Sequence, residues 1–403
     1  MKDLKHLYYF EKLLENANNE LVQQAKKDGK KIVGYTCYHM PEVLANVGEC
    51  CSVRLRAPNS SSLDIATYYM SNYSCEFARA LVERGIEGGY KFLDALAGTD
   101  TCSAMNRAIE HFSILQMTDN PNYFVTHIDA PFKIEDYTLE AYARQIKIHF
   151  LDKMRDVYGI DTSDAAIREA VREHNEVCEI ITEIGEMRKE LNPVITGYEF
   201  HILNLVSYAC PKYLIVDKLR ETLEELKTRK PDKVNPWRAR VVLIGSEIDD
   251  PDFTKLLEEQ GALIVADRFC FGSTPGREVI PLDDDKPALE QVCLFYMQHS
   301  ECPRYMEDAK VLHRRELADR LAREFKADGI IYEQLKYCDF WSFERALVSH
   351  ILAEEYDWPV LSVDRVYNVG SSGQLRTRFQ AFVESLEIKR IQKNREKAEK
   401  EAV

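Results

Sequence analysis

The sequence has no apolar run that approaches the roughly 20 residues a membrane-spanning helix needs. Its first 21 residues mix Lys, Glu and Asn in an amphipathic pattern and lack the apolar core of a signal peptide. We therefore expect a cytoplasmic protein that does not bind a membrane. At 403 residues the chain is too long for one ordinary core, so two or three domains are expected.

Compact metal and nucleotide motifs are also absent. The sequence contains no CxxC pair, no HExxH and no Walker A loop, so it gives no support for a zinc ribbon, a zincin or a P-loop enzyme. Basic residues are in deficit, with 53 Lys and Arg against 67 Asp and Glu and a net charge of −14. General nucleic-acid binding depends on Lys and Arg that neutralise phosphates, so no nucleic-acid partner is expected.

Cysteine, by contrast, is abundant, with eleven residues in the chain. In a reducing compartment these thiols are poor candidates for disulfides, which leaves metal binding or redox chemistry as the functional interpretation. Isolated cysteines are more often small buried hydrophobic residues, and Cys178, Cys210 and Cys293 fit that role because they lie in apolar-periodic segments. Cys302 lies beside Pro303 in an expected turn and has no assigned role.

Short β-rich runs alternate with helical patterns, which predicts an α/β fold with parallel sheets. The expected strands are Lys31–Cys37, Ser52–Arg56, Phe92–Gly98, Tyr123–Asp129, Arg240–Gly245, Leu263–Arg268, Gly329–Gln334 and Val360–Asp364. The expected helices are Leu63–Arg84, Ser103–Phe112, Ser163–Leu191, Asp252–Glu259, Glu307–Phe325, Trp341–Glu354 and Gly373–Ile388.

This pattern predicts two Rossmann-like parallel-sheet units that flank a cleft and are joined by a helical segment. The expected divisions are an N-terminal helix (1–29), a first α/β domain (30–135), a helical segment with linker (136–237), a second α/β domain (238–390) and a charged, helical tail (391–403).

Ligands of open parallel sheets bind at the carboxyl ends of the strands, and this rule selects among the cysteines. Cys37, Cys102, Cys270 and Cys338 each follow an expected strand, and Cys75 lies in or at the start of an expected helix. A site built from positions so far apart in the sequence would escape any short pattern.

A Gly- and Ser-rich stretch precedes the last expected helix. Ser371, Ser372 and Gly373 lead into that helix, and Arg376 follows. Backbone amides, small hydroxyls and a guanidinium suit an anion such as a phosphate, although a plain helix cap explains the pattern about equally well.

Four segments, in order along the chain, resemble the 2-hydroxyacyl-CoA dehydratase and benzoyl-CoA reductase family, of the 2-hydroxyglutaryl-CoA dehydratase D-component type. They are GYTCYHMPEVLANVGECCSVRLRAP, CEFARALVERGIEGGYKFLDALAGTDTCSAMNRAIEHF, GIIYEQLKYCDFWSFE and GQLRTRFQAFVESL. The resemblance spans about residues 31–388. It implies a 4Fe-4S cluster held by three cysteines, here Cys75, Cys102 and Cys338, with one iron open to a ligand.

For the chemistry, the resemblance implies radical dehydration of a 2-hydroxyacyl-CoA through a ketyl radical anion. The electron would come from a separate ATP-dependent iron–sulfur activator, and the partner would be a homologous subunit or a second copy of the chain. If a CoA thioester binds, its phosphates would lie at Ser371, Ser372, Gly373 and Arg376. His39 is a candidate for the proton-transfer base.

Additional thiols leave an alternative open. A related branch of the family holds a double-cubane (8Fe-9S) cluster and carries out ATP-dependent reductions. Cys37, Cys50 or Cys51, and Cys270 could supply its second set of ligands. A third possibility is a non-catalytic electron-relay subunit.

Overall fold

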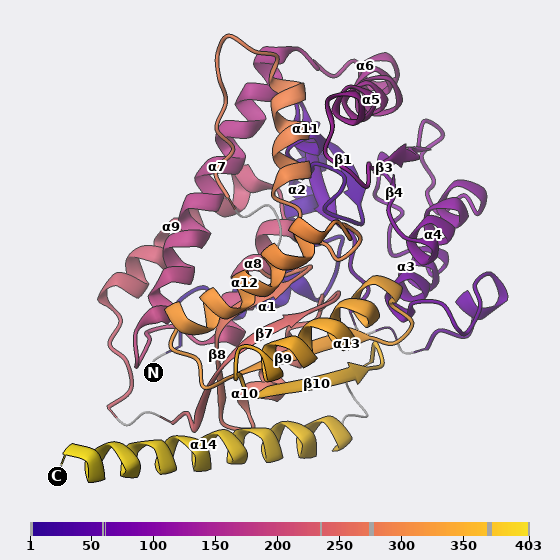
Figure 1. Ribbon diagram of the computed structural model, residues 1–403. Helices are drawn as coiled ribbons and strands as arrows, with labels where there is room; N and C mark the ends of the chain where they lie inside the picture. The colour runs from indigo at the N-terminus through magenta and orange to yellow at the C-terminus, as the bar shows by residue number, and fades with distance from the viewer. Residues whose placement is uncertain are drawn as a thin grey trace.

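The computed structural model describes residues 3–58, 60, 62–233, 236–273, 278–368 and 373–401, and its framework is two four-stranded parallel sheets (Figure 1). The first sheet has the order β2-β1-β3-β5 and the second has the order β10-β9-β7-β8. The strands are β1 (Lys31–Tyr35), β2 (Cys50–Arg54), β3 (Ala95–Ala97), β5 (Phe124–Val125), β7 (Ala239–Gly245), β8 (Ala262–Phe269), β9 (Gly329–Leu335) and β10 (Val360–Arg365). Two short strands, β4 (Thr99–Asp100) and β6 (Ile128–Asp129), form a separate parallel pair. The predicted α/β class with two parallel-sheet units is confirmed.

Both sheets share one strand order. In each, the strand that comes first along the chain lies in the middle, with the second strand on one side and the third and fourth on the other. In each sheet the chain therefore first adds a strand on one side of the central strand, β1 or β7, and then adds the next strands on the other side. Such a switch point opens a crevice at the carboxyl ends of the two neighbouring strands, which here are β1 with β3 and β7 with β9.

In the described part of the chain, fourteen α-helices and four short 3-10 or π segments connect and cover these sheets. In the first unit the α-helices are α1 (Leu7–Leu14), α2 (Glu20–Lys27), α3 (Glu76–Ile86) and α4 (Ser103–Ile114). The middle segment is helical as expected, with α5 (Asp136–Ile146), α6 (Asp152–Tyr158), α7 (Asp164–Glu186), α8 (Gly197–Ala209) and α9 (Lys212–Thr228). The second unit contains α10 (Pro251–Glu258), α11 (Ala288–Gln298), α12 (Asp308–Glu324), α13 (Asp339–Glu354) and α14 (Gly373–Glu401).

The short helical segments are η1 (Glu42–Asn46), η2 (Ala66–Tyr68), the π-helical η3 (Lys147–Leu151) and η4 (Met187–Lys189). Among the residues that the structure describes, none of the helices combines the length and the apolar composition that a bilayer crossing requires.

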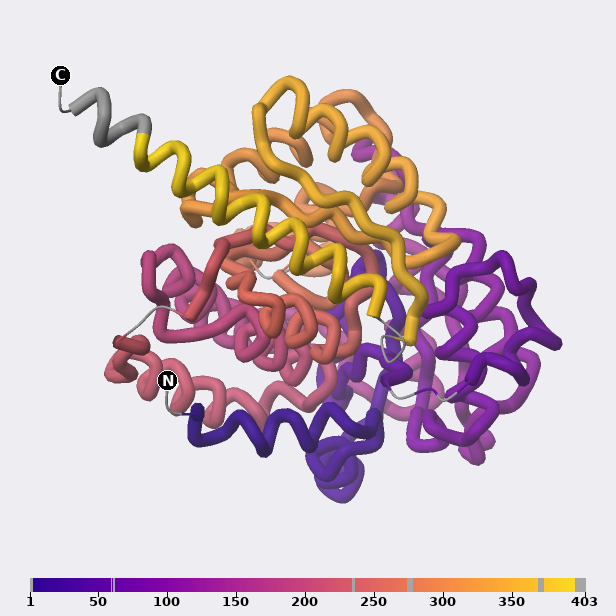
Figure 2. The backbone as a smooth tube through the Cα atoms, turned by 90° about the horizontal axis from the view of Figure 1, so that it is seen from below, coloured from indigo at the N-terminus to yellow at the C-terminus, as the bar shows by residue number. Residues whose placement is uncertain are grey.

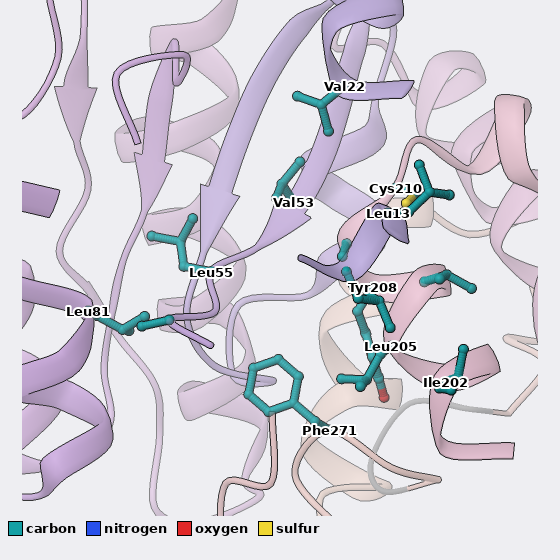
Figure 3. Packing of buried hydrophobic residues seen from close by; sticks show 14 of the residues in the cluster. Leu13, Val22, Val53, Leu55, Leu81, Ile202, Leu205, Tyr208, Cys210 and Phe271 are labelled. Atoms are coloured by element: carbon teal, nitrogen blue, oxygen red, sulfur yellow. The ribbon is translucent and has the colours of Figure 1, made fainter. Parts of the chain in front are cut away.

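Side chains of the first sheet alternate between two cores. Ile32 and Val53 face one hydrophobic cluster, whereas Val33 and Tyr35 face the other, as the two-residue period of a strand requires. Both faces are therefore covered, which explains the nearly unbroken apolar strands. The first of these clusters also includes Phe271 of the second unit, which packs beside α8 (Figure 3). The two units thus share part of one core.

The helix predicted from Leu63 begins later than expected. Residues 63–75 form η2 and a turn in which the backbone N–H of Ser74 donates to the carbonyl of Ser71 at 2.9 Å. Ser and Asn favour such local turns over helix because their side chains compete for backbone hydrogen bonds. Helix α3 therefore starts at Glu76, and Cys75 becomes its N-cap residue.

The last helix is longer than predicted. Helix α14 continues past Ile388 to Glu401, so the charged tail extends the same helix rather than forming a separate element. Phe379, Val383 and Leu386 anchor its first half in a core of the second sheet. Figure 2 shows the helix running from this anchored half away from the body of the protein.

Close packing at the β7/β9 switch point predicts a sensitive glycine. A Cβ atom on Gly245 would lie 2.9 Å from both the Cβ and the carbonyl oxygen of Glu333. We expect Gly245→Ala to lower the free energy of unfolding by about 1–3 kcal/mol, the usual cost of overpacking. Urea denaturation followed by circular dichroism measures this loss. Gly373→Ala is the control, because nothing lies within 4 Å of its added Cβ, and an equal loss in both variants would contradict the packing argument.

Candidate functional site: a cavity lined by six cysteines

One cavity of about 80 Å³ lies where the two switch points meet. Its lining combines residues of both α/β units, and six of them are cysteines: Cys37, Cys75, Cys102, Cys270, Cys302 and Cys338. The walls are otherwise mainly apolar and include Phe77, Met105, Phe340 and Trp341. A larger surface hollow of about 810 Å³, between α5, α6 and the starts of α7 and α11, contains none of the predicted site residues.

Three of the cysteines occupy equivalent places in the fold. Cys75, Cys102 and Cys338 are the N-cap residues of α3, α4 and α13, and their carbonyls accept the first helical hydrogen bonds from Arg79, Asn106 and Ser342. Their sulfurs are within mutual electrostatic range, since Cys75 and Cys102 both raise the pKa of Cys338. We call these three residues the helix-cap triad.

The pKa of each helix-cap thiol is raised by burial. For Cys75 it rises to about 11, and the backbone N–H groups of Ala78 and Phe77 at the start of α3 oppose the rise. The backbone N–H of Met105 in α4 opposes the rise in the pKa of Cys102, and that of Trp341 in α13 opposes the rise in the pKa of Cys338. Amides at a helix start carry partial positive charge, so they favour an anion at the cap position. All three helix starts therefore stabilise thiolates in the same cavity.

The remaining three cysteines form a second group. Cys37 follows β1, Cys270 follows β8, and Cys302 lies in the turn between α11 and α12. Burial is the main cause that raises the pKa of all three, to about 12 for Cys302, and Cys37 raises the pKa of the other two further. We call these residues the loop triad.

Backbone N–H groups and arginines both act on the loop triad, and the backbone N–H groups of His39 and Arg304 lower the pKa of Cys37 and Cys302 respectively. Arg54 lowers the pKa of Cys37 and Cys270, and Arg304 lowers the pKa of Cys37 and Cys302, although burial outweighs both. Arg54 ends β2, donates to the carbonyl of Cys270 and lies 3.8 Å from the centre of the Phe271 ring.

The carboxyl group of Glu247 raises the pKa of a thiol in each triad, Cys75 and Cys270. Glu247 lines the cavity two residues beyond β7 and pairs with Arg54 at 3.4 Å. Burial raises the pKa of Glu247 to about 7, and the neighbouring Arg54 and a hydrogen bond with Cys270 oppose the rise. The strand-end rule could have found this residue, because it follows Gly245-Ser246 at the end of a predicted strand.

Two of the predicted second-cluster candidates lie elsewhere. Cys50 and Cys51 begin β2, and Cys50 pairs with Lys31 at the amino end of the sheet, opposite the carboxyl edge. Both are buried in the hydrophobic cores and neither lines the cavity. Cys302, for which the sequence suggested no role, lines the cavity with Cys37 and Cys270.

His39 is buried beside the cavity but does not line it. Its ring lies 5.6 Å from that of Tyr305, and its Nε2 has no hydrogen-bond partner among the described residues. Burial and, less strongly, Arg304 lower its pKa well below the ordinary value, so the imidazole is neutral. Its role as a proton-transfer base stays a prediction.

The predicted phosphate site is only partly described. Ser371 and Ser372 lie outside the described residues, and Gly373 begins α14. Arg376 pairs with Glu259 at 3.0 Å on the surface and does not line the thiol cavity. The CoA-phosphate role of these residues therefore also stays a prediction.

Raised thiol pKa values predict a distinctive reactivity of the metal-free chain. Alkylation by iodoacetamide requires the thiolate, so its rate at Cys75 and Cys302 should rise about tenfold per pH unit from pH 7 to pH 10. An ordinary exposed thiol levels off once the pH exceeds its pKa near 8.5. Mass spectrometry of each cysteine peptide, with a short cysteine peptide as control, gives both profiles. A plateau near pH 9 at these two residues would show that burial does not raise their pKa.

Comparison with known proteins adds the family. The sequence profile described as "2-hydroxyglutaryl-CoA dehydratase, D-component" matches residues 37–386. The (R)-phenyllactyl-CoA dehydratase beta subunit of Clostridium sporogenes is 22% identical over 378 residues, covering 94% of this chain and 97% of that protein. The lactoyl-CoA dehydratase subunit beta of Anaerotignum propionicum is 22% identical over 375 residues, covering 89% and 92% of the two chains. A putative dehydratase subunit, YjiM, of Escherichia coli (strain K12) is 19% identical over 377 residues, covering 91% and 94%. The chain belongs to the 2-hydroxyglutaryl-CoA dehydratase D-component family.

Proposed function

We propose that the chain is an iron–sulfur redox subunit that holds a double-cubane cluster in the six-cysteine cavity. The observation that carries this proposal is the gathering of two groups of three cysteines in one buried cavity. Thiolates are the protein ligands of iron–sulfur clusters. A single 4Fe-4S cluster with an open iron uses three thiolates and would leave the loop triad without a function.

The described residues fit such a group chemically. No three His, Cys, Asp or Glu side chains in the described ranges are close enough together to hold a single metal ion. Thiolates of a cluster each bind a different iron, so they stand farther apart than the ligands of one ion. The fit rests on the donor set, because six thiols line one buried cavity and thiolates are the protein ligands of such clusters.

The chain's own residues would prepare the site for an anionic group. The six thiolates are the ligands, the starts of α3, α4 and α13 direct N–H groups at one side, and Arg54 and Arg304 supply positive charge at the other. Met105, Phe340 and Trp341 reduce contact with water. When bound, such a cluster supplies electrons at low potential, and its surroundings tune that potential.

An external electron source is part of the proposal. The sequence has no Walker A loop with which to bind ATP phosphates itself. We therefore assign ATP hydrolysis to a separate iron–sulfur activator and propose an ATP-dependent reductase of small molecules.

A second candidate function is radical dehydration of a 2-hydroxyacyl-CoA. The two beta subunits of acyl-CoA dehydratases that match along most of the chain favour it. In that case the helix-cap triad alone would hold a 4Fe-4S cluster, and a homologous second subunit would complete the enzyme. Incubation with an activator, ATP, the second subunit and a 2-hydroxyacyl-CoA, followed by mass spectrometry for the enoyl-CoA product, tests this candidate.

Iron content separates the two candidates. After anaerobic purification we expect about eight irons per chain for a double-cubane cluster, against about four for a single cubane. Cys102→Ala and Cys302→Ala should both lower the iron content, because each removes one ligand. Metal analysis and electron paramagnetic resonance provide the measurement.

Two variants serve as matched controls. Cys293→Ala and Cys50→Ala remove buried cysteines that do not line the cavity, and both should keep the iron of the unaltered protein. Four irons per chain that survive Cys302→Ala would support the single-cluster dehydratase instead. An iron-free, colourless protein would refute both candidates.

A further inference from the structure

Arg304 places an uncompensated positive charge at the cavity. It lies two residues after Cys302, lines the cavity and is only 2% exposed. Its guanidinium donates to the carbonyls of Ala130 at 2.9 Å and Pro131 at 3.4 Å, and its Nε has no hydrogen-bond partner within the described part of the chain. Among the described residues no carboxylate forms an ion pair with it. A buried charge without a counter-charge is costly, so its environment calls for an anion.

Several other buried arginines have carboxylate partners, whereas Arg56 and Arg240 donate to backbone carbonyls as Arg304 does. Arg54 pairs with Glu247, Arg188 with Asp267, Arg314 with Glu344 and Arg365 with Glu333. In two of these pairs, Arg54–Glu247 and Arg314–Glu344, the arginine also lowers the pKa of a loop-triad thiol. Each pair carries no net charge when its glutamate is ionised. Arg304 therefore supplies positive charge next to Cys37 and Cys302 that no carboxylate pairs with among the described residues.

Among the described residues, no cation is a main influence on the pKa of a helix-cap thiol. Backbone N–H groups oppose the rise in pKa of these thiols, while Glu247 and Glu76 add negative charge near Cys75. The two halves of the cavity therefore differ in electrostatics although each offers three thiols.

We propose that Arg304 is the counter-charge of the anionic iron–sulfur group at the loop triad and raises its reduction potential. This role rests on the proposed double-cubane function. Reduction there adds one electron, taken from a one-electron donor that is oxidised in the same step, and breaks no bond. The added negative charge lies near the guanidinium, so the positive charge of Arg304 stabilises the reduced form. Arg304 is thus a positioning and tuning residue that makes no bond to the cluster.

Two variants separate charge from shape. Arg304→Gln removes the charge and keeps a hydrogen-bond donor, whereas Arg304→Lys keeps the charge and loses the planar fork. Each protein is purified anaerobically, assayed for iron and titrated with a low-potential chemical reductant under electron paramagnetic resonance. We expect the midpoint potential of Arg304→Gln to become more negative and that of Arg304→Lys to stay near the value of the unaltered protein. Loss of iron in Arg304→Gln with retention in Arg304→Lys supports the same role.

Three outcomes would contradict the proposed role of Arg304. Unchanged potentials in both variants, equal shifts in both, or loss of iron from both would overturn the role of Arg304 as a counter-charge. The cause of failure is identifiable, because the unaltered protein is measured alongside. If that protein holds no iron, the proposed function fails; if it holds iron and only the expected shift is missing, the inference about Arg304 fails alone.

Discussion

Burial of six thiols in one cavity is the constraint on which the rest of the site depends. Burial raises the pKa of every one of these thiols, so without compensation they remain protonated and bind metal poorly. The protein offsets this penalty in two ways, with backbone N–H groups around both triads and with arginines around the loop triad. Both devices favour negative charge at the sulfurs. A purely structural cluster of buried cysteines would need neither.

Topology explains how positions so distant in sequence reach the same cavity. Both sheets place their first strand in the middle, so each has a crevice at the carboxyl ends of the neighbouring strands. Cys37 and Cys102 belong to the first crevice, and Cys338 and Glu247 to the second. Because the two crevices meet, a site forms that neither unit contains alone.

Much of this arrangement could be predicted from the sequence, and the failures have physical causes. All eight strands of the two sheets were expected, since buried parallel strands form unmistakable apolar runs. The strand-end rule selected Cys37, Cys102, Cys270 and Cys338, and all four line the cavity. The strand-end rule does not select Cys302, because Cys302 follows the helix α11 instead of a strand.

Cys50 and Cys51 illustrate the opposite error. One of them is offered by the sequence, with Cys37 and Cys270, as a ligand of a second cluster, although the predicted strand begins at Ser52, after both. In a parallel sheet the residues before a strand lie at the amino edge, and the register of Cys50 with Lys31 places them there. The carboxyl end of the same strand carries Arg54 instead. Direction along the strand was therefore the decisive signal, and residue type was not.

The shared core limits how the cavity can open. Phe271 and Leu335 of the second unit are fully buried in the same hydrophobic cluster as Val53 and Leu55 of the first (Figure 3 shows Val53, Leu55 and Phe271). Exposing a buried side chain of this size costs about 1.5–3 kcal/mol. Wide separation of the two units would expose several of them and would also break the Arg54–Glu247 contact, which joins β2 to the segment after β7. The cavity walls that the two α/β units contribute are therefore held at a fixed distance. A group with ligands from both units requires this. Access for an electron donor or a small substrate must then depend on local movements of the loops and helix starts at the cavity wall.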